Sequence, residues 1–254
     1  MKPKEIRSES NPFFKKLQKL TSSRGIRKFS MAFLSGPKNV KEVLEEFPSV
    51  CIGIICPSIE DLGPELWDTE LPSYVLPPAL FGRLDVHNTK KPLLIVRVAP
   101  FDEWSDVHWP KGCTLFLPFQ DPANVGAAIR SAAAFGVKRV VLLKEAAHPF
   151  HPKSLRAAGS SVFRVSLLQG PFLADLVIHS VPLVVLCPGG RNIATYSFPQ
   201  SFALLAGLEG PGLPKTLTRG EMVGIPMQPG VDSLNAALSV GIALYQWRVS
   251  MGRF

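Results

Sequence analysis

LFLPFQDPANVGAAIRSAAAFGVKRVVLL, residues 115–143, is the stretch that decides the fold. Its first five residues, Leu115 to Phe119, are an apolar run typical of a buried strand, and Lys138 to Leu143 form a second such run. Between them the alanine-rich segment Pro122 to Phe135 predicts a helix that stops at Gly136. A strand, a helix and a strand in this order indicate a βαβ unit, which builds a parallel sheet.

The same pattern continues toward the C-terminus. Further apolar runs predict buried strands at Val162 to Leu167, Leu183 to Leu186, Ala203 to Gly207 and Val223 to Met227. A largely apolar segment, Ser233 to Trp247, predicts a closing helix with Asp232 or Ser233 as its N-cap. The fold class is therefore α/β.

A second α/β module precedes this region. Two helices are expected within residues 11–47, the first capped by Asn11 with Pro12 at its first position, and the second from Pro37 to Phe47. Residues Ser22 to Lys28 read as a basic turn between them. Strands are expected at Phe29 to Leu34, Val50 to Ile55 and Leu93 to Val98, the segment 57–92 is rich in proline and turn signals, and Asp102 to Gly112 reads as a linker.

Composition excludes several classes of protein. Apolar residues make up 46% and charged residues 19% of the chain, which is typical of a globular protein and not of a disordered one. No apolar run approaches the ~18 residues of a membrane span, and the basic, polar start does not resemble a secretory signal. The four cysteines lack zinc-site spacing. We expect a cytoplasmic protein with reduced cysteines.

The positive charge is concentrated at one end of the chain. Residues 1–40 hold ten Lys or Arg and two acids, whereas the remaining residues hold 18 basic and 18 acidic side chains. All of the net charge of +8 therefore lies in the first forty residues. Such a block attracts polyanions, although a solvated basic tail has the same composition.

The first candidate site is the strand-to-helix turn of residues 120–130, QDPANVGAAIR. Ligands bind parallel sheets at the carboxyl ends of the strands, where this turn lies. Arg130 is the lone charge of its helix, so a buried Arg130 would need a compensating partner, whereas an exposed one would not. Asn124 and Arg130 lie about 120° apart around a helix, so both serve one site only if Asn124 lies in the loop or first turn.

The second candidate is LAGLEGPGL, residues 205–213, in which Glu209 stands among three glycines after an apolar strand. Glycines here let a ligand approach backbone N–H and C=O groups, although a plain tight turn accounts for the same pattern. The order of glycines matches neither a dinucleotide fingerprint nor a P-loop.

The third candidate combines IPM, residues 225–227, with GVDSLN, residues 230–235. Helix capping explains Ser233 well and Asn235 poorly, because asparagine is a weak helix former in the first turn.

Two smaller features lie between these motifs. His148 and His151 form half of a metal site without an evident third ligand, so we expect no metal. Lys153 and Arg156 could bind phosphate or be ordinary surface charge.

The order of the three motifs resembles the signature of the SpoU/TrmH family of the SPOUT superfamily. N-x-G-A-x-x-R, then G-x-E-G-x-G-L, then I-P-M and S-L-N cover about residues 112–248. The N-terminal stretch NPFFKKLQKLTSSRGIRK resembles the small, ribosomal-protein-like RNA-binding domain carried by members that act on ribosomal RNA. The resemblance implies a substrate-binding domain at 1–105 and a methyltransferase domain at 112–254, with a SPOUT-type parallel sheet and a C-terminal trefoil knot.

The resemblance also implies activity, cofactor and partners. Members are homodimers that transfer the methyl group of S-adenosyl-L-methionine to a ribose 2′-hydroxyl of RNA. Carried over by motif, the catalytic residues are Asn124, Arg130, Glu209, Ser233 and Asn235. The cofactor-binding residues are Leu205, Gly207, Glu209, Gly212, Ile225, Met227, Ser233, Leu234 and Asn235. The RNA-binding residues are Lys15, Lys16, Lys19, Arg24, Arg27, Lys28 and Arg156.

Arg130 stays protonated in ordinary surroundings, so we favour it as a group that orients phosphate and stabilises negative charge, and leave its action as a base open. Ribosomal RNA is the favoured substrate because the basic block lies in an added N-terminal domain, and 23S-type ribosomal RNA is the expected partner. The alternatives are a tRNA methyltransferase, a non-enzymatic RNA-binding or ribosome assembly factor on the same scaffold, and a small-molecule-binding α/β domain.

Overall fold

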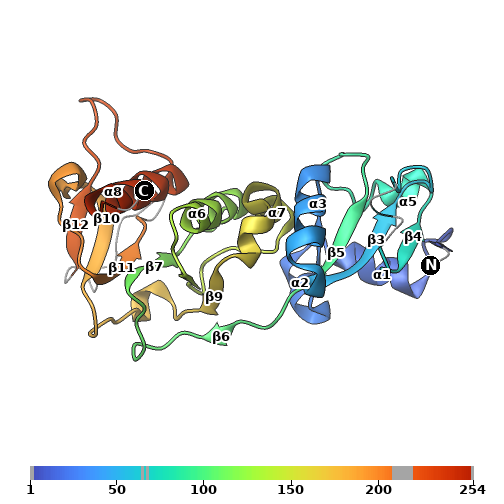
Figure 1. Ribbon diagram of the computed structural model, residues 1–254, viewed down its shortest axis with the longest axis horizontal. Coiled ribbons are helices and arrows are strands. Elements are labelled where there is room, and N and C mark those ends of the chain that lie inside the picture. The colour runs from blue at the N-terminus through green and yellow to red at the C-terminus, as the bar shows by residue number, and fades with distance from the viewer. Residues whose placement is uncertain (1–2, 64–65, 67–68, 208–219, 253–254) are drawn as a thin grey trace. The chain divides into compact units, whose positions relative to one another are not determined.

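Figure 1 shows the computed structural model, which describes residues 3–63, 66, 69–207 and 220–252. The chain forms two compact units, each assembled from two stretches of sequence. The first unit comprises Met1–Pro100 with His148–Ser160, and the second comprises Phe101–Ala147 with Ser161–Phe254. The first unit therefore includes a short segment from the middle of the region predicted to be catalytic, and the assignment of residues 1–105 to RNA binding stays a prediction.

The first unit is built on a mixed five-stranded sheet with the order β1-β4-β3-β5-β2. Its strands are β1 (Lys4–Glu5), β2 (Met31–Leu34), β3 (Cys51–Cys56), β4 (Ser73–Val75) and β5 (Leu93–Arg97). Its helices are α1 (Pro12–Lys19), α2 (Ser23–Phe29), α3 (Pro37–Glu46), α5 (Pro78–Phe81) and α7 (Pro152–Ala158). The strands and helices predicted here are found, with ends displaced by one or two residues, apart from the basic turn.

Local sequence explains the first helix, because Asn11 caps α1 and Pro12 opens it. The Asn11 side chain accepts hydrogen bonds from Phe13 N at 2.8 Å and Phe14 N at 3.3 Å. Phe14 and Leu17 then fall on one face and are fully buried against the sheet. This outcome confirms the cap and the proline position expected from the sequence.

The basic turn predicted at Ser22 to Lys28 is wrong, because these residues form the helix α2. Ser22 is its N-cap, and its hydroxyl accepts a hydrogen bond from Gly25 N at 3.3 Å. Gly25 suggested a turn, but it is needed for packing, since a Cβ at this position would overlap the backbone carbonyl of Lys19. The glycine lets α2 approach the end of α1 closely.

The second unit is built on a seven-stranded sheet with the order β12-β10-β11-β7-β8-β9-β6, in which every recorded pairing is parallel. Its strands are β6 (Asp102–Glu103), β7 (Gly112–Leu117), β8 (Arg139–Leu142), β9 (Ser166–Gln169), β10 (Leu183–Asn192), β11 (Ser201–Leu205) and β12 (Glu221–Gly224). Its helices are α6 (Pro122–Ala134) and α8 (Ala236–Ser250). The parallel α/β class predicted from residues 115–143 is confirmed.

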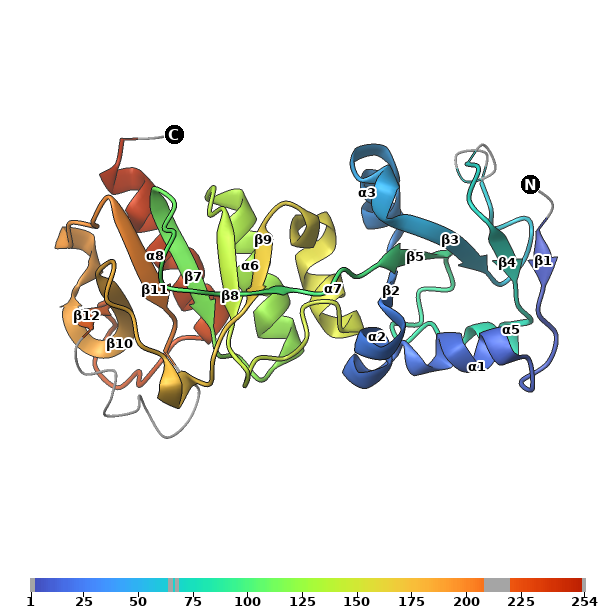
Figure 2. The same ribbon diagram turned by 90° about the horizontal axis from the view of Figure 1, so that it is seen from below.

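The two faces of this sheet are covered differently. Helices α6 and α8 lie side by side on one face (Figures 1 and 2), where the Trp247 ring of α8 packs on Phe202 of β11. The other face is covered by irregular segments that contribute Trp104, Trp109 and Leu173 to its apolar core. β6 pairs with β9, and both tryptophans contact Phe116. Residues 102–112, expected to be a linker, are thus packed as part of the second unit.

Two further features bear on function. All four cysteines are free thiols, as expected. None of the described helices is long and apolar enough to cross a membrane.

Candidate active site at the carboxyl ends of the second sheet

Strands β12, β10, β11 and β7 are neighbours and parallel, so their carboxyl ends lie at one edge of the sheet. The predicted motifs follow three of these strands. The first motif follows β7, Leu205 and Gly207 lie at the end of β11, and Ile225 and Met227 come directly after β12. This edge is where parallel sheets bind ligands.

Asn124 is buried in the first turn of α6, at 8% exposure. Asp121, rather than Asn124, is the N-cap of this helix, and its carboxylate accepts a hydrogen bond from Ala123 N at 2.9 Å. The geometry meets the requirement set by the sequence, that Asn124 lie in the loop or first turn. Its side chain is thereby available for a contact away from its own helix.

That contact is with Asn235, which lies 111 residues further along the chain. Asn235 Nδ2 donates a hydrogen bond to Asn124 Oδ1 at 2.9 Å, so the first and third motifs meet. Asn235 is also the N-cap of α8, because its Oδ1 accepts from Leu238 N at 3.0 Å. The prediction that Asp232 or Ser233 caps this helix is wrong: α8 begins at Ala236, and both residues are exposed in the loop before it.

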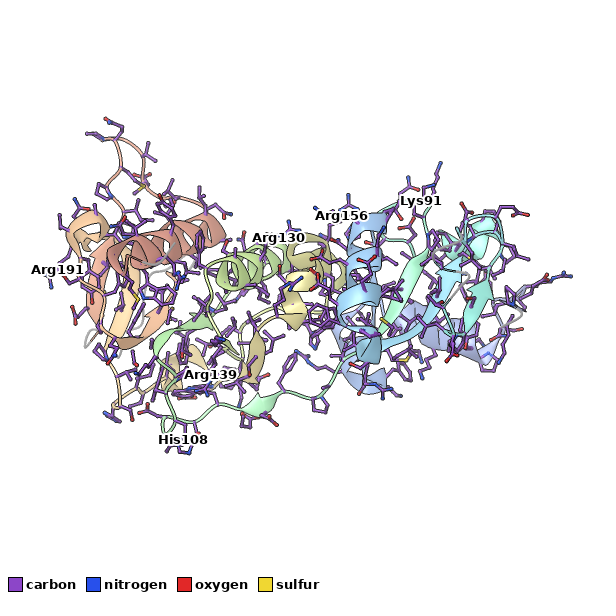
Figure 3. The ribbon with its side chains drawn as sticks, viewed as in Figure 1. Lys91, His108, Arg130, Arg139, Arg156 and Arg191 are labelled. Carbon is purple, nitrogen blue, oxygen red and sulfur yellow. The ribbon has the colours of Figure 1, made fainter. Side chains whose placement is uncertain are left out.

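Arg130 lies on the exposed side of α6, and Figure 3 labels it there. Within the described part of the chain it has no carboxylate partner and no hydrogen bond to either asparagine, so its guanidinium is available for an external anion. The structure thus joins Asn124 to Asn235 and leaves Arg130 apart from them. A phosphate group is a natural partner for such a guanidinium.

Backbones approach unusually closely at the ends of β10, β11 and β12. A Cβ at Gly207 would lie 2.7 Å from the Leu186 carbonyl oxygen, and a Cβ at Gly224 would lie 3.0 Å from the Cys187 carbonyl oxygen. Gly190 is equally constrained, because a Cβ at this position would lie 2.7 Å from Val223 N. These glycines bring three strand ends together, which leaves main-chain atoms to line the edge instead of side chains.

The segment Cys187 to Gly190 was not singled out from the sequence. It bulges out of the pairing between β10 and β12, whose register shifts between Leu186 and Arg191. The Pro188-Gly189-Gly190 triplet directly after an apolar run was the signal that could have found it. Burial raises the pKa of the Cys187 thiol, and the Gly190 backbone hydrogen bond opposes this in part, so the thiol stays protonated near neutral pH.

The remaining predicted residues are partly located. Leu205 is buried, while Gly207, Ile225, Met227 and Leu234 are half-buried along the edge and Ser233 is exposed. Glu209 and Gly212 lie outside the described residues.

The predicted RNA-binding residues lie in the first unit. Lys15, Lys16 and Lys19 are on α1, and Arg24, Arg27 and Lys28 are on α2. The Lys16 and Lys28 ammonium groups lie 5.3 Å and 5.7 Å from the centroid of the Phe29 ring. Arg156 is exposed on α7.

A comparison with known families decides which proteins this chain belongs with. The profile of the SpoU rRNA methylase family matches residues 115–245, which contain both asparagines and Arg130. The chain belongs to this SpoU family. The membership fits the parallel sheet and the meeting of the first and third motifs at its edge.

The relatives of this SpoU-family chain differ in how much of their own length it spans. It is 47% identical over 245 residues to ribosomal RNA small subunit methyltransferase G 2 of Syntrophobacter fumaroxidans, but it spans only 49% of that protein's length. It is 28% identical to the 23S rRNA (guanosine(2553)-2′-O)-methyltransferase RlmP of Bacillus subtilis, covering 96% of the chain and 99% of RlmP.

Solved structures show the same fold over nearly the whole chain. The SpoU methyltransferase AviRb from Streptomyces viridochromogenes, in complex with the cofactor AdoMet, superposes with a TM-score of 0.80 at 22% identity, covering 96% of this chain and 100% of AviRb.

Proposed function

We propose that the chain is an S-adenosyl-L-methionine-dependent methyltransferase that modifies a ribose 2′-hydroxyl of ribosomal RNA. The observation that carries this function is the hydrogen bond between Asn124 and Asn235, which joins two distant motifs at the carboxyl edge of the sheet. Membership of the SpoU family and full-length similarity to RlmP support ribosomal RNA as the substrate.

The residues at the strand ends fit the cofactor. Gly190, Gly207 and Gly224 hold three backbones so close together that side chains are excluded, which suits a ligand bound by main-chain atoms. The neighbouring half-buried Ile225 and Met227 would contact its apolar parts. When bound, S-adenosyl-L-methionine would supply an activated methyl group.

The chain's own polar residues would position the RNA. A ribose hydroxyl is a poor nucleophile and must be held close to the methyl group and helped to lose its proton. The exposed Arg130 would bind the adjacent phosphate and stabilise the negative charge that develops on the hydroxyl oxygen. The Asn124–Asn235 pair would fix α6 against the start of α8, so that Arg130 and the cofactor edge keep their spacing.

Substitution of Arg130 tests this function. Arg130→Ala should lower methyl transfer to ribosomal RNA by a factor on the order of 10² to 10³, because it removes a charge that stabilises the transition state. Cofactor affinity, measured by calorimetry, should stay close to that of the unsubstituted chain. Lys138→Ala, which removes an exposed cation at the amino end of β8, is the matched control.

Two outcomes would contradict the proposal. Methyl transfer by Arg130→Ala at the unsubstituted rate would show that the arginine has no such role. Failure of the unsubstituted chain to bind S-adenosyl-L-methionine would favour a non-enzymatic RNA-binding or assembly factor instead.

The finer features of the family are part of the same proposal. We propose a trefoil knot at the C-terminal end of the second unit, RNA binding by residues 1–105, catalysis by residues 112–254, and a cytoplasmic homodimer. Support for the homodimer comes from α8, where Leu238, Tyr245 and Val249 are 53%, 52% and 42% exposed on one side of the helix. An apolar stripe of this kind is typical of a surface that is covered in an assembly.

A further inference from the structure

The loop that connects α5 to β5 in the first unit has an unusual backbone. Asn88 has a φ of 48° and Lys90 a φ of 54°, and these are two of the three described non-glycine residues with positive φ. The left-handed region is unfavourable for a lysine, by about 1 kcal/mol or more. Glycine would adopt this conformation without steric cost. Because asparagine and lysine stand here instead, other contacts must hold the backbone in the left-handed region.

A buried carboxylate holds this loop. Asp85 is 6% exposed, and its Oδ2 accepts a hydrogen bond from Lys90 N at 2.8 Å. The Thr89 hydroxyl donates to the same carboxylate at 3.2 Å, and Asn88 N donates to the Asp85 carbonyl at 2.9 Å. The carboxylate thus accepts hydrogen bonds from the Lys90 backbone and the Thr89 hydroxyl, and no ion pair joins it to the Lys90 or Lys91 side chain among the described residues.

The loop presents cations on this fixed backbone. Lys90 and Lys91 are both exposed, and among the described residues neither has a carboxylate partner. Because the backbone of this loop is already ordered, only the lysine side chains lose conformational freedom when they bind an anion.

The same loop is joined to helix α7, which adds two more cations. His87 Nε2 lies 3.1 Å from the Pro152 carbonyl oxygen, at the first residue of α7. Lys153 and Arg156 of α7 are exposed and, in the described part of the chain, unpaired. Burial lowers the pKa of His151, and the neighbouring Lys153 and His87 lower it further. Figure 3 labels Lys91 and Arg156 at the upper edge of this unit.

We propose that the Asp85-anchored loop, residues 86–91, and α7 form a contact for the phosphate backbone of the substrate RNA, separate from the basic block of α1 and α2. The inference rests on the proposed function, since it takes RNA as the ligand. When exposed lysines and arginines neutralise phosphates, counterions are released from the RNA, and this release raises the affinity of the protein for RNA. The contact gives a role to the end of the segment 57–92, for which the sequence suggested none.

The test is a double substitution, Lys90→Ala with Lys91→Ala, in the full-length chain. The control is Lys111→Ala with Lys138→Ala, which removes the same charge from two exposed lysines before β7 and β8, at the edge opposite the candidate site. Binding to a ribosomal RNA fragment is measured over a range of salt concentrations. The slope of log affinity against log salt should become shallower by about 1.4 in the loop variant, or about 0.7 for each lost phosphate contact. The control should retain the slope of the unsubstituted chain.

The outcomes separate this inference from the proposed function. If the unsubstituted chain binds RNA and the loop variant binds with the same affinity and slope, the loop is not an RNA contact and the proposed function stands. If the unsubstituted chain binds RNA but transfers no methyl group, the proposed function is wrong, and the binding comparison still decides the loop. A chain that binds no RNA at all would overturn both.

Discussion

At the scale of single residues, Asn235 performs two tasks with one side chain. Its oxygen caps α8, while its nitrogen donates to Asn124. An amide carries its acceptor oxygen and its donor nitrogen on two separate atoms, so it can serve both partners at once. The sequence presents three good capping residues close together, Asp232, Ser233 and Asn235, and local propensity favoured the earlier two. Asn235 is the one that also contacts Asn124, 111 positions away. No local rule of helix capping could reveal that contact.

The two tasks of Asn235 can be separated by substitution. Asn235→Ser keeps a good N-cap but loses the donor to Asn124, so methyl transfer should fall while the free energy of unfolding changes little. Asn235→Ala loses both, and should in addition destabilise the protein by about 1–2 kcal/mol. Denaturant unfolding and methyl-transfer rates measure the two effects. Equal activity of Asn235→Ser and the unsubstituted chain would show that the asparagine pair has no part in the reaction.

At the scale of elements, the periodicity of apolar residues located most of the sheet in the second unit, because buried parallel strands are continuous apolar runs. It failed where an element is short or depends on packing. β6 has two residues, and its pairing with β9 and the contacts of Trp104 and Trp109 with Phe116 show that this segment belongs to the unit. Helix α2 was hidden because Gly25 resembles a turn residue until its neighbour is known.

The packing of α2 on α1 leads to a sharp prediction. Gly25→Ala should be strongly destabilising, by about 2–4 kcal/mol, since the new methyl group would overlap the Lys19 carbonyl and force the two helices apart. Gly63→Ala is the control, because no atom lies within 4 Å of a Cβ built there. Thermal unfolding followed by circular dichroism should show a lower midpoint for the first variant alone. An unchanged midpoint would mean that the helices can separate at no cost.

At the scale of the whole molecule, the first unit is discontinuous in sequence. Its second stretch, His148–Ser160, begins with a histidine that is only 5% exposed. Burial, helped by the charges of Arg27 and His151, lowers the pKa of His148 from 6.5 to about 4. A histidine with a lowered pKa is stable in its neutral form within the folded protein and takes up a proton on unfolding.

Acid should therefore weaken this unit. The contribution of His148 is complete above pH 6.5 and is lost as the pH falls from 6.5 toward about 4, to a total of about 1–3 kcal/mol. In His148→Asn the unfolding free energy should depend less on pH across this interval. His179→Asn, at an exposed site, should follow the unsubstituted chain. Parallel curves for all three proteins, measured by denaturant unfolding, would argue against a role for His148.

The strand order of the second unit has a consequence for how the protein is made. Its central strand β7 pairs with β11, whose residues Ser201–Leu205 are synthesised almost ninety residues later. The first unit, by contrast, has all of its residues once Ser160 has left the ribosome. A truncated chain that ends between Ser160 and Ser201 would contain all residues of the first unit but would lack β11 and β12 of the second sheet. With RNA binding by the first unit and methyl transfer by the second, as proposed, such a fragment would bind RNA without methylating it and would compete with the full-length chain.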